Sequence, residues 1–274
     1  MAARKGAKGP VVELSATGLS RFNGCEVRWL WHPDEDEPEL AKGRALNLGS
    51  VMHALVEARL RRIDWLPVLH ELAALEGWEP GYQLPDPFDT ALWLMRRHEE
   101  RYPTLPQTVS TEIPFELWLP DAPVPTKVRG RMDGLVMLSA LELFAFDAPE
   151  ECGPGLYLWE TKTMSDWQRL DWLSVDPQLG TYDWATEAMG FVDVQGIVYE
   201  AIKTYHWVKD RPVHESFQRL VLPRNPGLVE KTLDTYRRAA KRAAEVLAAP
   251  SEAIPALGRD CVRCPAYGDC FPTK

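Results

Sequence analysis

The chain has 274 residues, 45% of them hydrophobic, which is enough for one sizeable core, so we expect a single domain over residues 1–274. Its formal net charge of -9 argues against nucleic-acid binding when charge is read globally, and its five cysteines fit metal ligands better than a disulfide framework. No apolar stretch approaches a membrane span and the N-terminal tail lacks the apolar part of a signal peptide, which predicts a soluble, cytoplasmic protein without a membrane partner.

Apolar periodicity, proline and glycine predict the secondary structure. Mixed strands with helices on both sides indicate an α/β or α+β core, with a mixed sheet flanked by helices. In chain order we expect helices over 45–63 and 86–101, a hairpin of strands 109–119 and 127–138, a strand over 155–163, a helix over 177–189, strands over 192–203 and 214–222, and a long helix over 226–248.

Two of these helices carry basic clusters, which we interpret either as solvated faces or as tracks for DNA phosphates. Their residues are Arg59, Arg61 and Arg62 in one helix and Arg237, Arg238, Lys241 and Arg242 in the other.

Carboxylates on two neighbouring strands suggest a site for a hard divalent cation. Asp133 lies in the sequence GRMDG, and Glu160 and Lys162 lie at the end of the next strand. Asp133 and Glu160 would bind Mg²⁺ or Mn²⁺, as phosphodiester cleavage requires. Positions 160 and 162 share one face of a strand, so Lys162 would point at the attacking water or the phosphate. The same triplet alone also suits an ordinary ion pair at a strand end.

Three further residues fit the same site, although each taken singly is also a common structural residue. His53, on the helix over 45–63, could complete a carboxylate site with a neutral imidazole. Gln178 and Tyr182 are four residues apart on a predicted helix, so they share one face. There both could hydrogen-bond the DNA backbone beside the metal.

Four cysteines have the spacing of a metal site that joins the two ends of the chain. Cys25 is near the start, and Cys261, Cys264 and Cys270 form a C-x2-C-x5-C run near the end. Four thiolates suit either a tetrahedral zinc ion or a [4Fe-4S] cluster, and Pro265 and the x5 spacing favour the cluster. Such a site would clasp a lobe built from residues 19–31 and 257–272 against the core.

The ordered set of these motifs resembles the RecB-like, iron-sulfur branch of the PD-(D/E)xK nuclease superfamily. Members include CRISPR-associated RecB-like exonucleases, the AddB nuclease domain and phage relatives. The resemblance spans nearly the whole chain and includes an opening motif at Leu19, Phe22 and Cys25.

The resemblance implies a restriction-endonuclease-like core and a metal-dependent DNA exonuclease, acting in recombination, repair or DNA processing. Its partners would be single-stranded DNA or DNA ends, and recombination or CRISPR-type proteins. It would work in the cytoplasm of a bacterium, or of the host if a phage encodes it. The site carried over from the family has catalytic Asp133, Glu160 and Lys162, the metal ligands His53, Asp133 and Glu160, an additional acidic residue at Glu112, Gln178 and Tyr182 on DNA, and Cys25, Cys261, Cys264 and Cys270 on the cluster.

Two departures from the family pattern are visible. Glu26 replaces the usual proline after the first cysteine, and the stretch from Gly134 to Gly155 is long and acidic, as an insertion near the mouth of the site would be. A different class of function is a DNA-binding clamp subunit of a larger helicase-nuclease or CRISPR-type assembly, with little cleavage of its own. A third possibility is the same enzyme held by structural zinc.

Four tryptophans lie around the strand over 155–163 and the helix that follows. Stacking of their rings on unpaired bases would suit single-stranded DNA, whereas core packing is their commoner use. They are Trp159, Trp167, Trp172 and Trp184.

Overall fold

The computed structural model describes residues 11–31, 44–75, 87–164, 167–191, 193–204 and 216–256, together with Cys261, Cys264 and Cys270. The chain divides into two compact units. The first holds residues 1–39, 114–130 and 226–274, and the second holds residues 40–113 and 131–225. The single nuclease domain expected over the whole chain stays a prediction.

The strands form one six-stranded mixed sheet with the order β1-β3-β4-β5-β6, and β2 pairs with β3 outside this path. The pairs β1–β3 and β4–β5 are parallel, whereas β3–β4 and β5–β6 are antiparallel. The strands are β1 (Val12–Leu14), β2 (Gln107–Trp118), β3 (Thr126–Leu138), β4 (Gly155–Met164), β5 (Val194–Lys203) and β6 (Phe217–Pro223). The mixed sheet flanked by helices agrees with the predicted fold class.

Most predicted elements are present with nearly the expected limits, although the predicted starts at residues 86, 192 and 214 lie outside the described residues. Seven elements were not predicted: β1, α1, α2, α4, α6 and the 3₁₀ helices η2 and η4. The helices are α1 (Ala16–Gly24), α2 (Glu26–Trp31), α3 (Arg44–Leu60), α4 (Trp65–Leu75), α5 (Pro87–Arg101), α6 (Ala140–Ala145), η2 (Trp167–Val175), α7 (Pro177–Ala188), α8 (Pro226–Ala248) and η4 (Pro250–Glu252).

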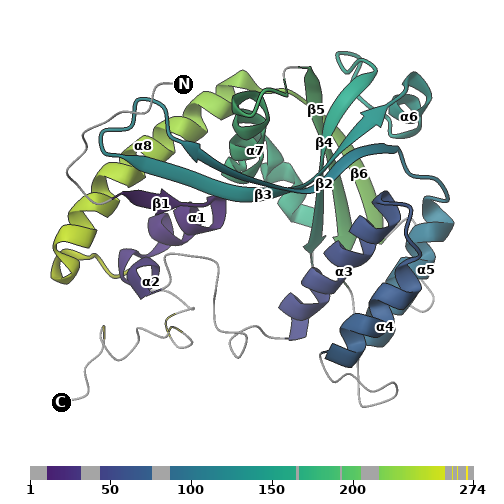
Figure 1. Cartoon of the computed structure of the whole chain (residues 1–274), viewed down its shortest axis with the longest axis horizontal. Helices are drawn as coiled ribbons and strands as arrows, with labels where there is room; N and C mark the ends of the chain where they lie inside the picture. Colours follow the sequence, from purple (N-terminus) through teal and green to yellow (C-terminus); the bar gives the residue numbers. More distant parts are fainter. Residues whose placement is uncertain are drawn as a thin grey trace. The chain divides into compact units, whose positions relative to one another are not determined.

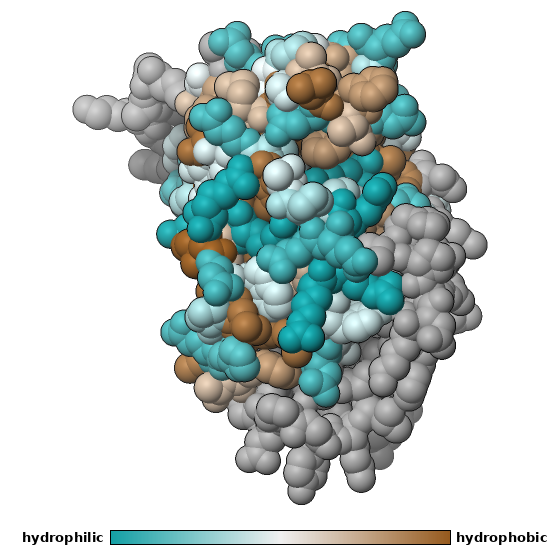
Figure 2. Space-filling model, turned by 90° about the vertical axis from the view of Figure 1, so that its right-hand side faces the viewer, coloured by the Kyte–Doolittle hydropathy of each residue, from teal (hydrophilic) through white to brown (hydrophobic). Residues whose placement is uncertain are grey.

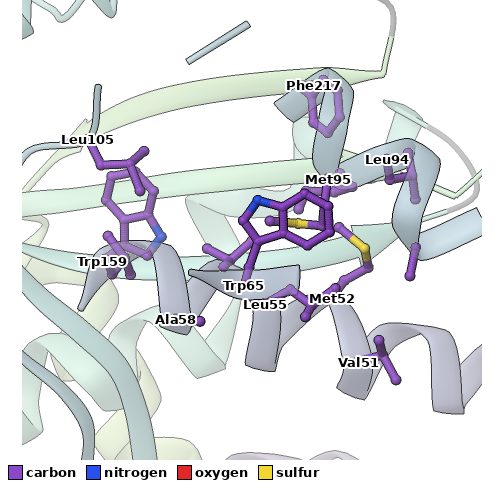
Figure 3. Packing of buried hydrophobic residues seen from close by; sticks show 14 of the residues in the cluster. Val51, Met52, Leu55, Ala58, Trp65, Leu94, Met95, Leu105, Trp159 and Phe217 are labelled. Atoms are coloured by element: carbon purple, nitrogen blue, oxygen red, sulfur yellow. The ribbon is translucent and has the colours of Figure 1, made fainter. Parts of the chain in front are cut away.

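The core of the second unit lies where α3, α4 and α5 pack on one face of the strands (Figure 1). Trp159 of β4 is fully buried in this cluster, which also contains side chains of α3 and α5 (Figure 3). Because side chains alternate along a strand, Glu160 and Lys162 point to the opposite face, where α7 lies. Core packing therefore fixes the face on which the predicted catalytic side chains stand.

A buried ionic network beside this core links the helices α3 and α5 to the strands β5 and β6. Glu200 of β5 accepts hydrogen bonds from Arg219 Nε at 2.7 Å and from His98 Nε2 at 2.9 Å, and both Glu200 and His98 are fully buried. Arg59 donates to Nδ1 of the His98 ring, which assigns the neutral Nε2–H tautomer to that ring. Arg219 also stacks on Tyr102, its guanidinium carbon 3.4 Å from the ring centre.

The first basic cluster is largely structural. Arg59 donates to the carbonyl of Tyr102 at 2.7 Å, and Arg62 donates to the carbonyl of Leu105 at 2.6 Å, so both hold the end of α3 against the segment after α5. Arg61 pairs with Glu57 on the surface. Each cluster keeps two exposed cations, Arg61 and Arg62 in the first and Arg238 and Lys241 in the second, on α8.

The first unit is held together by the carboxylate of Glu26, the residue that departs from the family pattern. Arg242 of α8 donates to both of its oxygens at 2.9 Å, and the backbone N–H of Ile254 donates to it at 2.8 Å. The preceding residue, Cys25, accepts a hydrogen bond through its sulfur from the N–H of Ala256 at 3.5 Å. Glu26 therefore joins the start of α2 to α8 and to the segment after it.

The acidic stretch between β3 and β4 lies at the end of these strands away from the predicted site. The antiparallel register places Leu138 opposite Gly155. A strand rises about 3.3 Å per residue, so the connection begins roughly 16 Å along β3 from Asp133. The expectation that it lies near the mouth of the site is therefore wrong.

Helix α6, in this connection, begins with a capping box formed by Ser139 and Glu142. Leu141 and Phe144 are 80% and 87% exposed. Figure 2 shows apolar residues gathered at the top of one face, at the height of α6 in Figure 1. Phe144 is thus an exposed aromatic residue remote from Asp133 along the strands.

Among the described residues, no helix has the length and apolarity to cross a membrane.

The buried network predicts a loss of stability in mild acid. Burial lowers the pKa of His98, and the charges of Arg219 and Arg59 lower it further. Burial alone would raise the pKa of Glu200, but the charges and hydrogen bonds of Arg219 and His98 together outweigh burial and bring that pKa to about 2. Both groups bind more protons when unfolded, so their stabilisation is complete above about pH 6.5 and falls as the pH drops, first through His98 and below about pH 4.5 through Glu200.

We therefore expect the free energy of unfolding to fall by up to about 1.4 kcal/mol per pH unit below pH 6 on account of His98. Urea unfolding at pH 7.5, 6.5 and 5.5 measures this slope. His98→Gln should flatten it, while the surface variant His70→Gln should keep it. Equal slopes in wild type and His98→Gln would contradict the assignment.

Candidate active site

His53 reaches the site because α3 lies close to β4. A side chain at Gly49, one turn earlier on α3, would place its Cβ 2.9 Å from Thr163 Oγ1 of β4, so glycine permits this close approach. His53 Nδ1 then lies 3.3 Å from Asp133 Oδ2. The structure thus brings together the predicted histidine and the first predicted carboxylate.

Asp133 lies on β3 at the point where this strand separates from β4. The ladder between the two strands ends at the pair Gly134–Trp159. Beyond it, Asp133 Oδ2 accepts a hydrogen bond from the backbone N–H of Thr161 at 2.8 Å. Since Thr161 stands between Glu160 and Lys162, this bond fixes Asp133 beside both.

Glu160 is the most constrained group of the site. It is 2% exposed, and its Oε2 atom has no hydrogen-bond partner among the described residues. Burial raises the pKa of this carboxyl well above its usual value, the negative charge of Asp133 raises it further, and the ammonium of Lys162, 3.9 Å from Oε1, opposes the shift. A buried carboxylate with an unpartnered oxygen beside a second carboxylate is an environment that a divalent cation stabilises.

Gln178 connects the predicted catalytic side chains to α7. Its Nε2 donates to Glu160 Oε1 at 2.9 Å and to the hydroxyl of Tyr182 at 3.0 Å, and its Oε1 accepts from Lys162 Nζ at 2.9 Å. Asp176 caps α7 by accepting from the N–H of Gln178 at 2.8 Å. Gln178 therefore orients Glu160 and Lys162 directly, and its contact with DNA stays a prediction, as does that of Tyr182.

Glu112 lies on β2 beside this group, with a positive φ of 49° that is unusual for a residue with a side chain. Its Oε2 pairs with Arg131 Nε at 2.5 Å. Burial raises the pKa of Glu112, Arg131 lowers it, and the charges of Glu57 and Asp133 raise it. Glu112 is thus near the site and is held by an arginine.

Sequence reasoning missed two acidic residues close to the site. Glu57 is one turn after His53 on α3, and it accepts from Thr111 Oγ1 at 3.2 Å. Its i+4 spacing from His53 was the available signal. The other is Asp176, whose charge also raises the pKa of Glu160. The sequence feature that could have identified Asp176 is an aspartate directly before Pro177, which is typical of a helix N-cap.

In the first unit, two of the predicted cluster ligands contact one residue. Cys25 Sγ accepts from the N–H of Ala256 at 3.5 Å, and Cys261 Sγ donates to the carbonyl of Ala256 at 3.6 Å. Cys264 donates its N–H to the carbonyl of Cys261 at 3.0 Å, and Cys270 lines a cavity of about 750 Å³ together with Val27 and Leu30 of α2. These contacts place all four cysteines near the segments that Glu26 joins.

The rest of the predicted cluster lobe over 257–272 lies outside the described residues. None of the five cysteines is in a disulfide, and across the described ranges no group of three or more His, Cys, Asp and Glu is arranged to hold a metal ion.

Comparison with known proteins gives a family for residues 13–270, which match the model of the PD-(D/E)XK nuclease superfamily. The chain is similar in structure to a protein from Eubacterium rectale that is provisionally named an exonuclease, with a TM-score of 0.57 and 13% identity over 96% of this chain and 94% of the other. A protein named SSO0001 matches with a TM-score of 0.43 and 14% identity over 97% of this chain and 89% of the other. No curated protein matches.

The environment of Glu160 predicts a cation that stabilises the fold. At a Mn²⁺ concentration of 100 times its Kd, the free energy of unfolding should rise by about 2.7 kcal/mol, which corresponds to roughly 5–10 °C in Tm. Glu160→Gln should abolish this shift, and it should be no less stable than wild type without metal, because an amide removes the buried charge.

The matched control is Glu99→Gln, which changes an exposed carboxylate of α5 and should keep the full shift in Tm. Thermal melts with and without Mn²⁺ measure both effects. An undiminished shift in Glu160→Gln would exclude Glu160 as a ligand.

Proposed function

Because this chain belongs to the PD-(D/E)XK nuclease superfamily, we propose that it is a divalent-metal-dependent exonuclease that hydrolyses DNA, with a preference for single strands. The observation that carries the proposal is the joint placement of His53, Asp133, Glu160 and Lys162 in one unit, where a buried oxygen of Glu160 has no hydrogen-bond partner among the residues that the structure describes. We assign His53, Asp133 and Glu160 as ligands of Mg²⁺ or Mn²⁺. Glu112, held by Arg131, is an additional acidic residue beside them.

The chemistry is hydrolysis without a covalent enzyme intermediate. Water attacks phosphorus, the bond to the leaving sugar oxygen breaks, and that oxygen takes up a proton. A bound divalent cation would polarise the phosphoryl oxygen and lower the pKa of the attacking water. Lys162 Nζ, 42% exposed on its side chain and fixed by Gln178, can hydrogen-bond the water and offset the charge that develops on the phosphate.

Gln178 and Tyr182 serve this chemistry from α7. The amide of Gln178 fixes Glu160 and Lys162 relative to each other, so both are oriented before DNA arrives. Tyr182 supports that amide through its hydroxyl. We propose that Gln178 and Tyr182 also hold a DNA phosphate once it enters the site.

We further propose that the protein belongs to the RecB-like, iron-sulfur branch and that Cys25, Cys261, Cys264 and Cys270 hold a structural [4Fe-4S] cluster. Support comes from the C-x2-C-x5-C spacing and from the contact of Cys25 and Cys261 with the same residue, Ala256. Thiolates are the ligands of such clusters and equally of zinc. The biological setting that fits this branch is recombination, repair or DNA processing, with the proteins of those processes as partners.

Lys162→Ala tests the catalytic assignment. Cleavage of end-labelled single- and double-stranded DNA in Mg²⁺ or Mn²⁺ should fall by about 10² to 10³ in kcat, since one charge-stabilising donor is lost. Binding measured by fluorescence anisotropy in Ca²⁺ should change little. Lys231→Ala, on α8, is the control and should cleave normally.

Unchanged cleavage in Lys162→Ala would overturn the site assignment. Tight DNA binding by the wild type with no cleavage in either cation would instead favour a DNA-binding clamp subunit.

Metal analysis tests the cluster. After anaerobic purification we expect about four iron and four sulfide per chain. Cys264→Ser should lower both, whereas Cys152→Ser, which changes the cysteine outside the predicted set, should leave them intact. Zinc without sulfide would support the zinc-held form, and neither metal would contradict the assignment of the four cysteines.

A further inference from the structure

We propose that Trp172 is a base-stacking residue of the DNA site, so that the site takes a nucleotide whose base is unpaired. The inference rests on the nuclease function proposed above and adds the residue that would select the substrate.

The four candidate tryptophans differ in their exposure: two are buried, one is half-buried and one is exposed. Trp159 and Trp184 are buried, at 0% and 8% exposure, and belong to the core. Trp167 is half-buried, with the ammonium of Lys203 5.1 Å from its ring centre. Trp172 is 72% exposed. A large aromatic ring normally gains stability by burial, so an exposed tryptophan at a ligand site is informative.

Trp172 stands on η2, the segment that leads from β4 to α7. The elements on either side of η2 each contribute a residue to the proposed site: β4 contributes Lys162 and α7 contributes Gln178. A 3₁₀ helix rises about 2.0 Å per residue, which places Trp172 roughly 8 Å along the chain from Asp176. Asp176 in turn bonds the N–H of Gln178 at 2.8 Å. The exposed ring is therefore tied closely to the catalytic group through its own segment.

The surroundings of η2 have the charge that a nucleotide requires. β4 and β5 are parallel, with Met164 paired to Lys203, and the N–H of Thr204 donates to the carbonyl of Met164 at 2.9 Å. The carboxyl ends of parallel strands are the usual place for a ligand in such sheets. Lys162 and Lys203 both lie at this edge, so positive charge for phosphate and aromatic faces for bases occur together.

An unpaired base fits this combination better than a duplex does. Inside a duplex both faces of a base are covered by neighbouring bases, and a terminal base is still paired and stacked on one side, so freeing either costs unstacking or unpairing energy. A single strand presents its bases without that cost, and stacking on an aromatic side chain tolerates every base.

The test compares Trp172→Ala and Trp172→Phe with the wild-type chain. The ligands are a labelled oligothymidylate and an oligonucleotide of the same length built from abasic units. Binding is measured by anisotropy in Ca²⁺ and cleavage in Mn²⁺. Phe144→Ala, an exposed aromatic on α6, is the matched control.

We expect Trp172→Ala to weaken oligothymidylate binding by about 5- to 150-fold, to leave abasic binding unchanged, and Trp172→Phe to restore most of the loss. Phe144→Ala should match wild type. If Trp172→Ala binds oligothymidylate normally, or loses both ligands equally, the inference fails while cleavage by the wild type still supports the nuclease. If the wild type cleaves no DNA but binds bases through Trp172, the inference stands and the hydrolytic function fails.

Discussion

The placement of Glu160 beside Asp133 is the constraint on which the rest of the site depends. One carboxyl is buried with an oxygen that has no hydrogen-bond partner in the described part of the chain, and the other carboxyl stands close enough to raise the pKa of the first. Such a pair is costly to fold unless opposite charge is supplied. The protein supplies part of it through Lys162 and holds the geometry through Gln178 and the backbone of Thr161. The negative charge of such a site is only partly compensated by the protein, and a bound metal ion can compensate the rest.

The sheet explains how residues from distant parts of the chain meet at this point. The antiparallel pairing of β3 with β4 brings Asp133 to Glu160, and their separation past Gly134 frees the N–H of Thr161 for the Asp133 carboxylate. On the other face the same strand places Trp159 in the core cluster that includes side chains of α3 and α5. One strand thus serves the core with alternate residues and the chemistry with the others, so a shift of one residue in register would exchange the two roles.

The long elements and the order of the site residues were predictable from sequence, because apolar periodicity and motif spacing are local properties. The helix that carries His53 and the strand that carries Glu160 have nearly their predicted limits. The features that could not be predicted from sequence depend on tertiary contacts. Arg59 and Arg62 have the spacing of a basic face, yet they bond carbonyls beyond α5. Nothing local marks Glu200 for burial with Arg219, and the sequence cannot tell whether Gln178 points at DNA or at Glu160.

The ion pair of Glu26 with Arg242 has a consequence for the cysteine-bearing tail. The chain up to Ala256 is anchored by Arg242, Ile254 and Cys25 through hydrogen bonds that involve no metal. The segment that ends at Ala256 is therefore held in place by hydrogen bonds, and these bonds do not depend on a metal at the cysteines. A chain cut after residue 256 would lose Cys261, Cys264 and Cys270 together, whereas the hydrogen bonds of Glu26 with Arg242 and Ile254 lie before that point and would be kept.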